Sequence, residues 1–179
     1  MSDMMQRARD LDAADPIAHF RDRFDLPEGV IYLDGNSLGA LPKASRERLH
    51  KVIDAEWGEG LIRSWNELPG GGGDWIAMPQ RVGAKIAPLV GAQAHEVIAC
   101  DSVSVNLAKL IGAALSLNPG RKVVLSEPGN FPTDLYMIQG QPQVEQRLAE
   151  RDKMIEALDE SVALLLLTHV HYKTGEMFD

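Results

Sequence analysis

Polar and glycine-rich segments follow four short apolar runs of this sequence, and they contain the side chains most able to do chemistry. The four segments are residues 34–40, 101–106, 127–134 and 168–175. In open α/β folds, ligands bind beyond the carboxyl ends of the parallel strands, where such segments are delivered to one edge of the sheet. We therefore expect a functional site to be built from these four segments.

The first segment contains Gly35-Asn36-Ser37-Leu38-Gly39, which matches the G-x-S-x-G string of serine hydrolases. A nucleophile elbow needs its serine on a sharp turn that leads directly into a helix. Here Ala40, Leu41 and Pro42 come between the string and the next predicted helix. The context favours an ordinary Gly-Asn turn over a serine triad.

The second segment, residues 101–106, opens a predicted helix with two serines. Hydroxyls and free backbone N–H groups at a helix N-terminus suit a phosphate, because the donors and the helix dipole point the same way. Ser102 or Ser104 could equally be a plain N-cap. By itself the segment favours the cap, since every helix has N-terminal donors to satisfy and few helices bind phosphate.

The third segment, residues 127–134, bends at Pro128 and Gly129 and then brings Phe131 and Asp134 to the start of another predicted helix. An aromatic ring and a carboxylate at this place could stack on a planar ligand and hydrogen-bond to it. They could equally be a core aromatic and a helix cap. The residues alone favour neither interpretation.

The fourth segment contains His169 and His171, which point to the same face if the chain is extended there. Such a pair could supply two ligands of a metal site, but a third ligand would have to come from elsewhere. The sequence has no H-E-x-x-H, C-x-x-C or G-x-G-x-x-G string, and we predict neither a metal site nor a dinucleotide site. Four glycines at 70–73 lack the strand and Lys-Ser/Thr pair of a P-loop and indicate a surface loop.

Helical and short apolar segments alternate along the chain, which indicates an α/β fold with a parallel sheet covered by helices on both faces. Helices are predicted at residues 15–24, 42–57, 75–91, 104–117, 131–140 and 151–160, and strands at 30–34, 96–100, 122–127 and 162–170. The charge of −8, with its basic residues dispersed, argues against binding to nucleic acid or to anionic membranes. The longest apolar run, residues 162–167, is too short to cross a bilayer. A single cysteine, Cys100, and an N-terminus without an apolar leader fit a cytoplasmic protein.

Longer strings in this order resemble the kynureninase family of fold-type-I, aminotransferase-like pyridoxal-phosphate enzymes. They are IYLDGNSLGALP at 31–42, EWGEGLIRSWN at 56–66, DSVSVNLAKL at 101–110, NFPTDLY at 130–136 and LTHVHYKTGEMFD at 167–179. The resemblance extends from about Asp12 to the last residue. It implies an N-terminal helical and extended segment at residues 1–60. Residues 61–179 would be the N-terminal portion of the large domain that binds pyridoxal phosphate.

The resemblance also implies roles for individual residues. Val103 and Ser104 match positions that hold the cofactor phosphate, and Phe131 matches the residue that stacks on the pyridine ring. The other implied cofactor contacts are Pro132, Thr133, Asp134, Thr168 and His171. The implied lining of the substrate pocket is Asn36, Ser37, Gly39, Trp57 and Trp65.

The implied reaction is hydrolysis of L-kynurenine, or of 3-hydroxykynurenine, to anthranilate or 3-hydroxyanthranilate and L-alanine. This step belongs to the kynurenine pathway of tryptophan catabolism, which leads to NAD, and the family is usually homodimeric. In the family, the Schiff-base lysine and the acid at the ring nitrogen come after the H-Y-K-T-G segment, so Lys173 is not assigned to that role. We therefore expect a fragment that lacks the rest of the large domain and the small domain, contains no catalytic residue and is inactive alone.

Two alternatives stay open. The chain could belong to another fold-type-I enzyme, such as a cysteine desulfurase-like protein. It could also be a non-catalytic fragment that associates with a partner chain through an unpaired sheet edge.

Overall fold

The computed structural model describes residues 3–178, which form two compact units. Unit 1 ends at Ile98 and unit 2 begins at Ala99. This division differs from the expected boundary at residue 60, because hydrogen bonds to Glu56 from Ser64 and Trp75 join the chain on the two sides of that position. The boundary at residue 60 stays a prediction about the domains of the whole protein.

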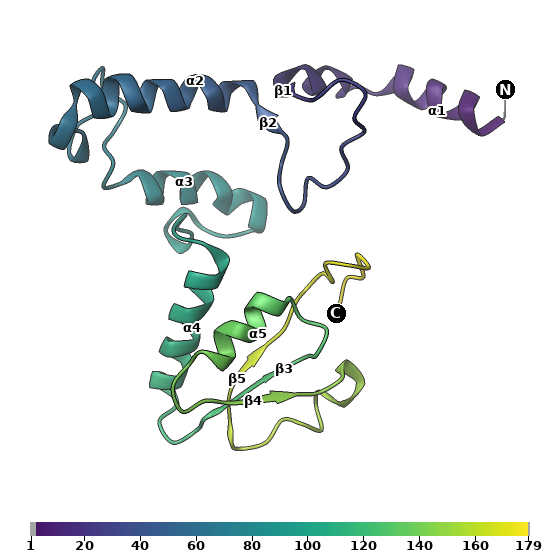
Figure 1. Ribbon diagram of the computed structural model, residues 1–179, viewed down its shortest axis with the longest axis vertical. Helices are drawn as coiled ribbons and strands as arrows, with labels where there is room; N and C mark the ends of the chain where they lie inside the picture. Colours follow the sequence, from purple (N-terminus) through teal and green to yellow (C-terminus); the bar gives the residue numbers. More distant parts are fainter. Residues whose placement is uncertain (1–2, 179) are drawn as a thin grey trace. The chain divides into compact units, whose positions relative to one another are not determined.

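Unit 1 is built from short helices and one small antiparallel ribbon (Figure 1). Its elements are α1 (Asp3–Ala14), η1 (Ala18–Arg23), β1 (Phe24–Asp25), β2 (Leu41–Pro42), α2 (Lys43–Lys51), η2 (Val52–Glu59), η3 (Leu61–Trp65), α3 (Met78–Ile86), η4 (Ala87–Val90) and η5 (Ala94–Glu96). Strands β1 and β2 pair antiparallel. The predicted helix at 42–57 is confirmed as α2, which continues into the π-helical turns of η2. The glycines at 70–73 all have positive φ and form the predicted loop.

Two predicted strands of this part of the chain are wrong. Residues 30–34 form no strand, and the side chains of Ile31 and Leu33 are almost fully exposed. An apolar run becomes a strand only where a neighbouring strand pairs with it, and no strand among residues 3–178 pairs with this run. At 96–100, η5 and its Gln93–Glu96 capping box occupy the start of the predicted strand, and residues 97–100 lack a pairing partner within the described chain. Helix α1 was not predicted, because none of its residues is buried and its sequence shows no apolar face.

Unit 2 is a three-stranded parallel sheet with helices packed on it, which confirms the predicted α/β class. Its elements are α4 (Val103–Leu117), β3 (Val123–Ser126), α5 (Pro132–Gln139), β4 (Glu145–Leu148), η6 (Arg151–Lys153) and β5 (Val162–Leu166). The strand order is β4-β3-β5, and both pairs are parallel. All four residues of the central strand β3 are buried.

Alternate residues of β3 face two separate apolar clusters, as the pleat of a strand requires. Val124 packs with Ile111 of α4 and Ile138 of α5, the two helices beside the sheet in Figure 1. On the other face, Val123 and Leu125 pack with Met154.

Met154 belongs to the predicted helix at 151–160, which is wrong beyond the single turn η6. The segment inserts Met154 into the core and packs Ala157 against it. It then ends in a turn in which the N–H of Ser161 donates to Asp159 at 2.8 Å. Such a local hydrogen bond between an aspartate and its neighbouring backbone favours a turn over a helix.

Candidate functional site

The starts of α4 and α5 and the end of β5 converge at the carboxyl edge of the sheet in unit 2. Asn118, just after α4, donates from Nδ2 to the carbonyl of Ala163 at 3.3 Å, so the helix ends beside the start of β5. Helix α4 has fifteen residues and is roughly 22 Å long. Because its last turn lies beside the start of β5, its first turn lies towards the end of β5. Accordingly, Leu107, Leu135 and Leu166 pack against one apolar cluster.

The N-terminus of α4 has two backbone donors without an acceptor in the helix. Ser102 is the N-cap, and its Oγ accepts the N–H of Val105 at 3.3 Å. The N–H groups of Val103 and Ser104 precede that bond and have no intrahelical partner. Val103 is 70% exposed, and Ser104 is half-buried. The cap and the phosphate interpretations are therefore compatible: Ser102 caps the helix, and two donors remain for an anion.

The segment that enters α4 is fixed by side chains of the helix itself. Asn106 donates from Nδ2 to the carbonyl of Cys100 at 2.9 Å. Lys109 pairs with the carboxylate of Asp101, a residue in the left-handed region at φ 48°, and the hydrogen bond to Asp101 raises the pKa of Lys109. This pairing offsets a negative charge that would otherwise repel an anion at the helix N-terminus.

A buried polar pair holds the loop after β3. Ser126 is fully buried and donates from Oγ to the carbonyl of Leu166 on β5 at 2.8 Å. Asn130, also buried, donates from Nδ2 to Ser126 Oγ at 3.2 Å and accepts the N–H of Phe131 at 2.7 Å. These bonds leave the ring of Phe131 at the surface, 45% exposed, where a planar ligand can reach it.

Residues 132–134 form the first turn of α5 directly after this ring. Pro132 occupies the first helical position, where its missing N–H costs nothing. Thr133 is exposed, and Asp134 is half-buried. Burial raises the pKa of the Asp134 carboxyl above its ordinary value. The carboxyl group of Asp134, with its raised pKa, therefore lies about one helical turn from Phe131.

His171 lies on a loop, residues 168–178, that leaves β5 and turns back at Gly175. Its Nδ1 accepts the N–H groups of Lys173 and Thr174, both at 3.3 Å. A Cβ added at Gly129 would lie 3.5 Å from Nε2, so the ring packs against this glycine. Because Nδ1 is an acceptor, the neutral ring has its proton on Nε2, which can donate to a ligand.

A cavity of about 340 Å³ opens beside the rings of this edge. It is lined by residues 128–130 of the loop after β3, by residues of α5, and by His171, Tyr172 and Lys173. Two of the predicted cofactor residues, Pro132 and His171, line it from opposite segments of the chain.

An ion pair between a buried carboxylate and a partly exposed arginine, which the sequence did not reveal, crosses the same edge. Arg151 donates from Nε and Nη2 to the two carboxylate oxygens of Glu127, at 2.6 and 2.7 Å. Thr168 donates its N–H to Glu127 at 3.3 Å, and its carbonyl accepts from Arg151 at 2.9 Å. One signal was present in the sequence: Glu127 follows the apolar run Val123–Leu125 with only Ser126 between them, and a carboxylate so close to a buried strand needs a polar or charged partner.

In unit 1, the predicted substrate residues Asn36, Ser37 and Gly39 lie on an exposed turn. The carbonyl of Asp34 accepts the N–H groups of Ser37 and of the next residue, both at 3.2 Å. The short strand β2, not a helix, follows, and this context disfavours a nucleophile elbow.

The predicted pocket tryptophans are both largely exposed. Trp57 lies on η2, and Trp65 ends η3 and meets Trp75 edge to face at 6.0 Å. Trp75 in turn donates from Nε1 to Glu56 at 3.0 Å.

Glu56 is 1% exposed and is a second buried carboxylate that the sequence did not reveal. Arg48 binds both of its oxygens, at 2.7 and 3.1 Å. Burial alone would raise the pKa of the Glu56 carboxyl, but hydrogen bonds from Trp75 and Arg48 and the charges of Arg48 and Lys51 hold it below its usual range.

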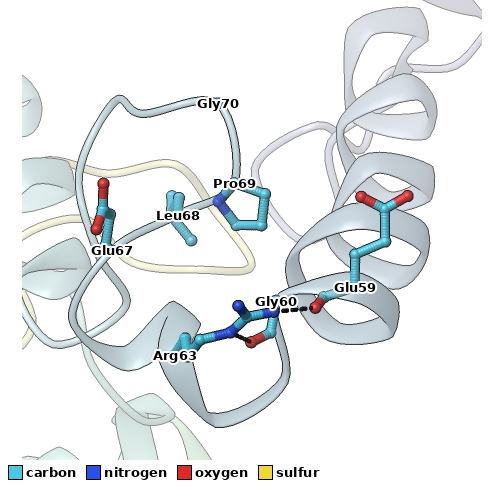
Figure 2. Close-up of a pocket in the computed structure, with 7 residues that line it drawn as sticks. All are labelled: Glu59, Gly60, Arg63, Glu67, Leu68, Pro69 and Gly70. Carbon is cyan, nitrogen blue, oxygen red and sulfur yellow. Dashed lines mark hydrogen bonds between the residues drawn. The ribbon is translucent and has the colours of Figure 1, made fainter.

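A second cavity, of about 300 Å³, lies in unit 1 and is shown in Figure 2. It is lined by Glu59, Gly60, Arg63 and residues 67–70. Arg63 turns its guanidinium to the carbonyls of Glu59 and Gly60, at 2.9 and 3.3 Å. None of the predicted site residues lines this cavity.

Thus the structure gathers the eight predicted cofactor residues at one edge of unit 2 and places the five predicted substrate residues in unit 1; their roles remain predictions. Within residues 3–178, no group of three or more His, Cys, Asp or Glu side chains is arranged to hold a metal ion. Among the helices of the same residues, none is both long and apolar enough to cross a membrane.

No protein-family model matches the chain. Individual relatives do match it. Kynureninase of Deinococcus radiodurans is 53% identical over 173 residues, which are 94% of this chain and 42% of the relative. Kynureninases of Burkholderia mallei and Burkholderia pseudomallei are 48% identical over 184 residues, which are 97% of this chain and 43% of each relative. The chain spans about two fifths of the length of these curated relatives. Over nearly its whole length, this chain belongs to the kynureninase family.

Proposed function

We propose that this chain forms the first part of a pyridoxal-phosphate-dependent kynureninase, which hydrolyses L-kynurenine or its 3-hydroxy derivative to the corresponding anthranilate and L-alanine. The observation that carries the proposal is the set of groups at the carboxyl edge of unit 2. A helix N-terminus with free donors, an exposed aromatic ring and a histidine with an oriented ring converge there, in a chain related to kynureninases.

The residues of this edge fit the chemistry of pyridoxal phosphate. The N–H groups of Val103 and Ser104 would hold the phosphate, because two donors and the positive end of the helix dipole favour an anion. The exposed face of Phe131 would stack on the pyridine ring. When bound, the cofactor supplies the electron sink that allows the Cα proton to leave and the Cβ–Cγ bond to break.

Three further side chains would act on the bound molecule. His171 would donate from Nε2, because its Nδ1 is occupied as an acceptor by two backbone N–H groups. Asp134 would hold a proton on its carboxyl more readily than an exposed aspartate does, because burial raises its pKa. The Thr168 hydroxyl donates to the carbonyl of Val170 in its own loop at 3.5 Å. It would contact the cofactor in place of this long hydrogen bond.

For the substrate, we propose the turn at Asn36, Ser37 and Gly39 and the rings of Trp57 and Trp65. Both tryptophans leave large parts of their rings uncovered within unit 1, as an aryl-binding surface requires. We also propose that the functional protein works in the cytoplasm as a homodimer, and that a lysine outside this chain binds the cofactor. The chain alone should therefore turn over no kynurenine.

A chimera tests this proposal. In it, the chain replaces the matching 42% of the Deinococcus radiodurans kynureninase. We expect the chimera to bind pyridoxal phosphate and to release fluorescent anthranilate from L-kynurenine, whereas the isolated chain releases none.

A desulfurase would instead release sulfide from L-cysteine, so the chimera is assayed with both substrates. Sulfide release without anthranilate would move the chain to another fold-type-I activity. A folded chimera that fails to bind pyridoxal phosphate would favour a non-catalytic fragment.

A further inference from the structure

We infer that Arg151 is a positioning residue: through Glu127 and the backbone of Thr168 it sets the place of the loop that presents His171 to the cofactor. The inference rests on the proposed function, because it assigns a purpose to the same edge of unit 2. Neither Arg151 nor Glu127 is among the predicted cofactor contacts.

The guanidinium of Arg151 joins all three strands at their carboxyl ends. Arg151 follows β4, Glu127 follows β3 and Thr168 follows β5, in the strand order β4-β3-β5. The two bonds to Glu127 are the parallel pair that a guanidinium forms with a carboxylate. A third bond, from Nη2 to the carbonyl of Thr168, leaves the same group. One side chain thus fixes the place from which the loop departs.

The 168–178 loop also returns to Arg151. Phe178 donates its N–H to the carbonyl of His169 at 2.8 Å, and its ring lies on the guanidinium of Arg151. Between these points, His171 donates its N–H to the carbonyl of Glu176 at 2.8 Å. Both ends of the loop that carries His171 are therefore anchored to a single arginine.

Because Glu127 is buried, loss of either charge of the Glu127–Arg151 pair is costly for the fold. The side chain of Glu127 is 5% exposed, and that of Arg151 is 29% exposed. A carboxylate so buried needs charged partners, and removing one of them leaves the other uncompensated. Lysine would keep the charge but offers a single ammonium in place of a planar fork, so it cannot serve both carboxylate oxygens and the Thr168 carbonyl in the same geometry.

The competing view is that the ion pair only stabilises the fold. The two views differ in what happens when both charges are removed together. Replacement of a buried ion pair by apolar side chains of similar volume is often neutral for stability. Stability would then recover, whereas the bonds to the N–H and carbonyl of Thr168 would remain absent.

The experiment compares Arg151→Met, Arg151→Lys and the double variant Glu127→Leu/Arg151→Met with the unaltered protein. The matched control is Arg147→Met, which removes an arginine of β4 whose partners, Asp159 and Ser161, precede β5 and lie away from this edge. Amide hydrogen exchange on the full chain reports the 168–172 segment and β3 separately. The affinity for pyridoxal phosphate is measured on the chimera, with the melting temperature of each variant.

We expect the double variant to recover a melting temperature near that of the unaltered protein. Its 168–172 amides should still exchange at least about tenfold faster, and its cofactor affinity should be lower by about tenfold, the scale of a lost charge-assisted bond. Arg151→Lys should show the same local exchange, and Arg147→Met should not.

The inference is overturned if exchange at 168–172 in the double variant equals that of the unaltered protein, or changes only in step with β3. Normal cofactor affinity in the double variant would overturn it as well. Failure of the chimera to cleave kynurenine speaks against the proposed function instead, because the exchange measurement needs neither cofactor nor turnover.

Discussion

The ring of Phe131 meets the ring of Tyr172 edge to face, with centroids 4.8 Å apart and planes inclined by 72°. Tyr172 also stacks on His171 at 5.4 Å, with an interplanar angle of 25°. The loop after β3 and the loop after β5 are thus joined by aromatic contacts in front of the sheet edge. Tyr172 therefore packs against Phe131, the ring that is proposed to stack on the cofactor.

Replacing Tyr172 with leucine removes the edge-to-face contact and frees the Phe131 ring to turn. Aromatic pairs of this kind contribute about 0.5–1.5 kcal/mol. We therefore predict that Tyr172→Leu weakens pyridoxal-phosphate binding by the chimera about 2- to 12-fold, measured by titration. Tyr172→Phe is the control, since it keeps the ring and removes the hydroxyl; an equal loss in both variants would show that the hydroxyl, not the ring, matters.

The two N–H groups of α4 that are proposed to hold the phosphate allow a test that leaves the helix intact. Val103 is the first helical residue, a position that proline favours, and Ser102 already has the extended φ and ψ of −101° and 165° that a residue before proline needs. Val103→Pro therefore removes one N–H donor at little cost to stability. We expect the affinity of the chimera for pyridoxal phosphate to fall about tenfold. Val103→Ala keeps the N–H and should bind normally; equal affinities in the two variants would contradict the phosphate role.

Most of unit 2 could be predicted from the sequence because its patterns are local. β3 and β5 are apolar runs, and α4 begins at a serine cap, so each element carries its own signal. The strand β4 was missed because its sequence, EQRL, is polar and half-exposed. Its place depends on pairing with β3, which no local pattern records.

The same limit applies to the site. Phe131 and His171 could be assigned to this edge because each lies in the segment that follows a recognisable strand, Phe131 after β3 and His171 after β5. Their cofactor roles rest on the family resemblance and stay predictions. The bond from Arg151 to Glu127 could not be predicted, because 24 residues separate the partners and their meeting depends on the strand order. The local sequence predicts which element a side chain lies next to, but the strand order decides which distant residue it contacts.

Gly60 occupies a position in unit 1 that admits no side chain. A Cβ added there would lie 2.0 Å from Ser64 Oγ and 2.5 Å from the carbonyl oxygen of Glu56. Since the Ser64 hydroxyl donates to that same carbonyl at 2.6 Å, Gly60→Ala must break the bond or shift η2. We predict a loss of about 1–3 kcal/mol in unfolding free energy, the usual cost of overpacking.

All three tryptophans lie in unit 1, so their fluorescence in urea measures this loss. Gly35→Ala is the control, because its added methyl group meets no atom within 4 Å. It should change the unfolding free energy by less than about 0.5 kcal/mol. Equal unfolding curves for the two variants would contradict the close packing at Gly60.

Asp159 gives unit 2 a pH dependence of known sign. Hydrogen bonds from the hydroxyl and the N–H of Ser161, followed by Arg147, lower the pKa of its carboxyl from 3.8 to about 2. Because the folded state holds the ionised form more tightly than the unfolded state does, Asp159 stabilises the fold above pH 3.8. That contribution disappears as the pH falls towards 2.

We therefore predict that Asp159→Asn lowers the unfolding free energy at pH 7, and that its difference from the unaltered chain shrinks between pH 4 and pH 2. Circular dichroism in urea at a series of pH values measures this. Ser161→Ala removes the first of the three causes and should show part of the same dependence. A difference that stays constant across this range would mean that the asparagine disturbs the turn before β5 through its shape, because a charge effect must vanish once the carboxylate is protonated in both states.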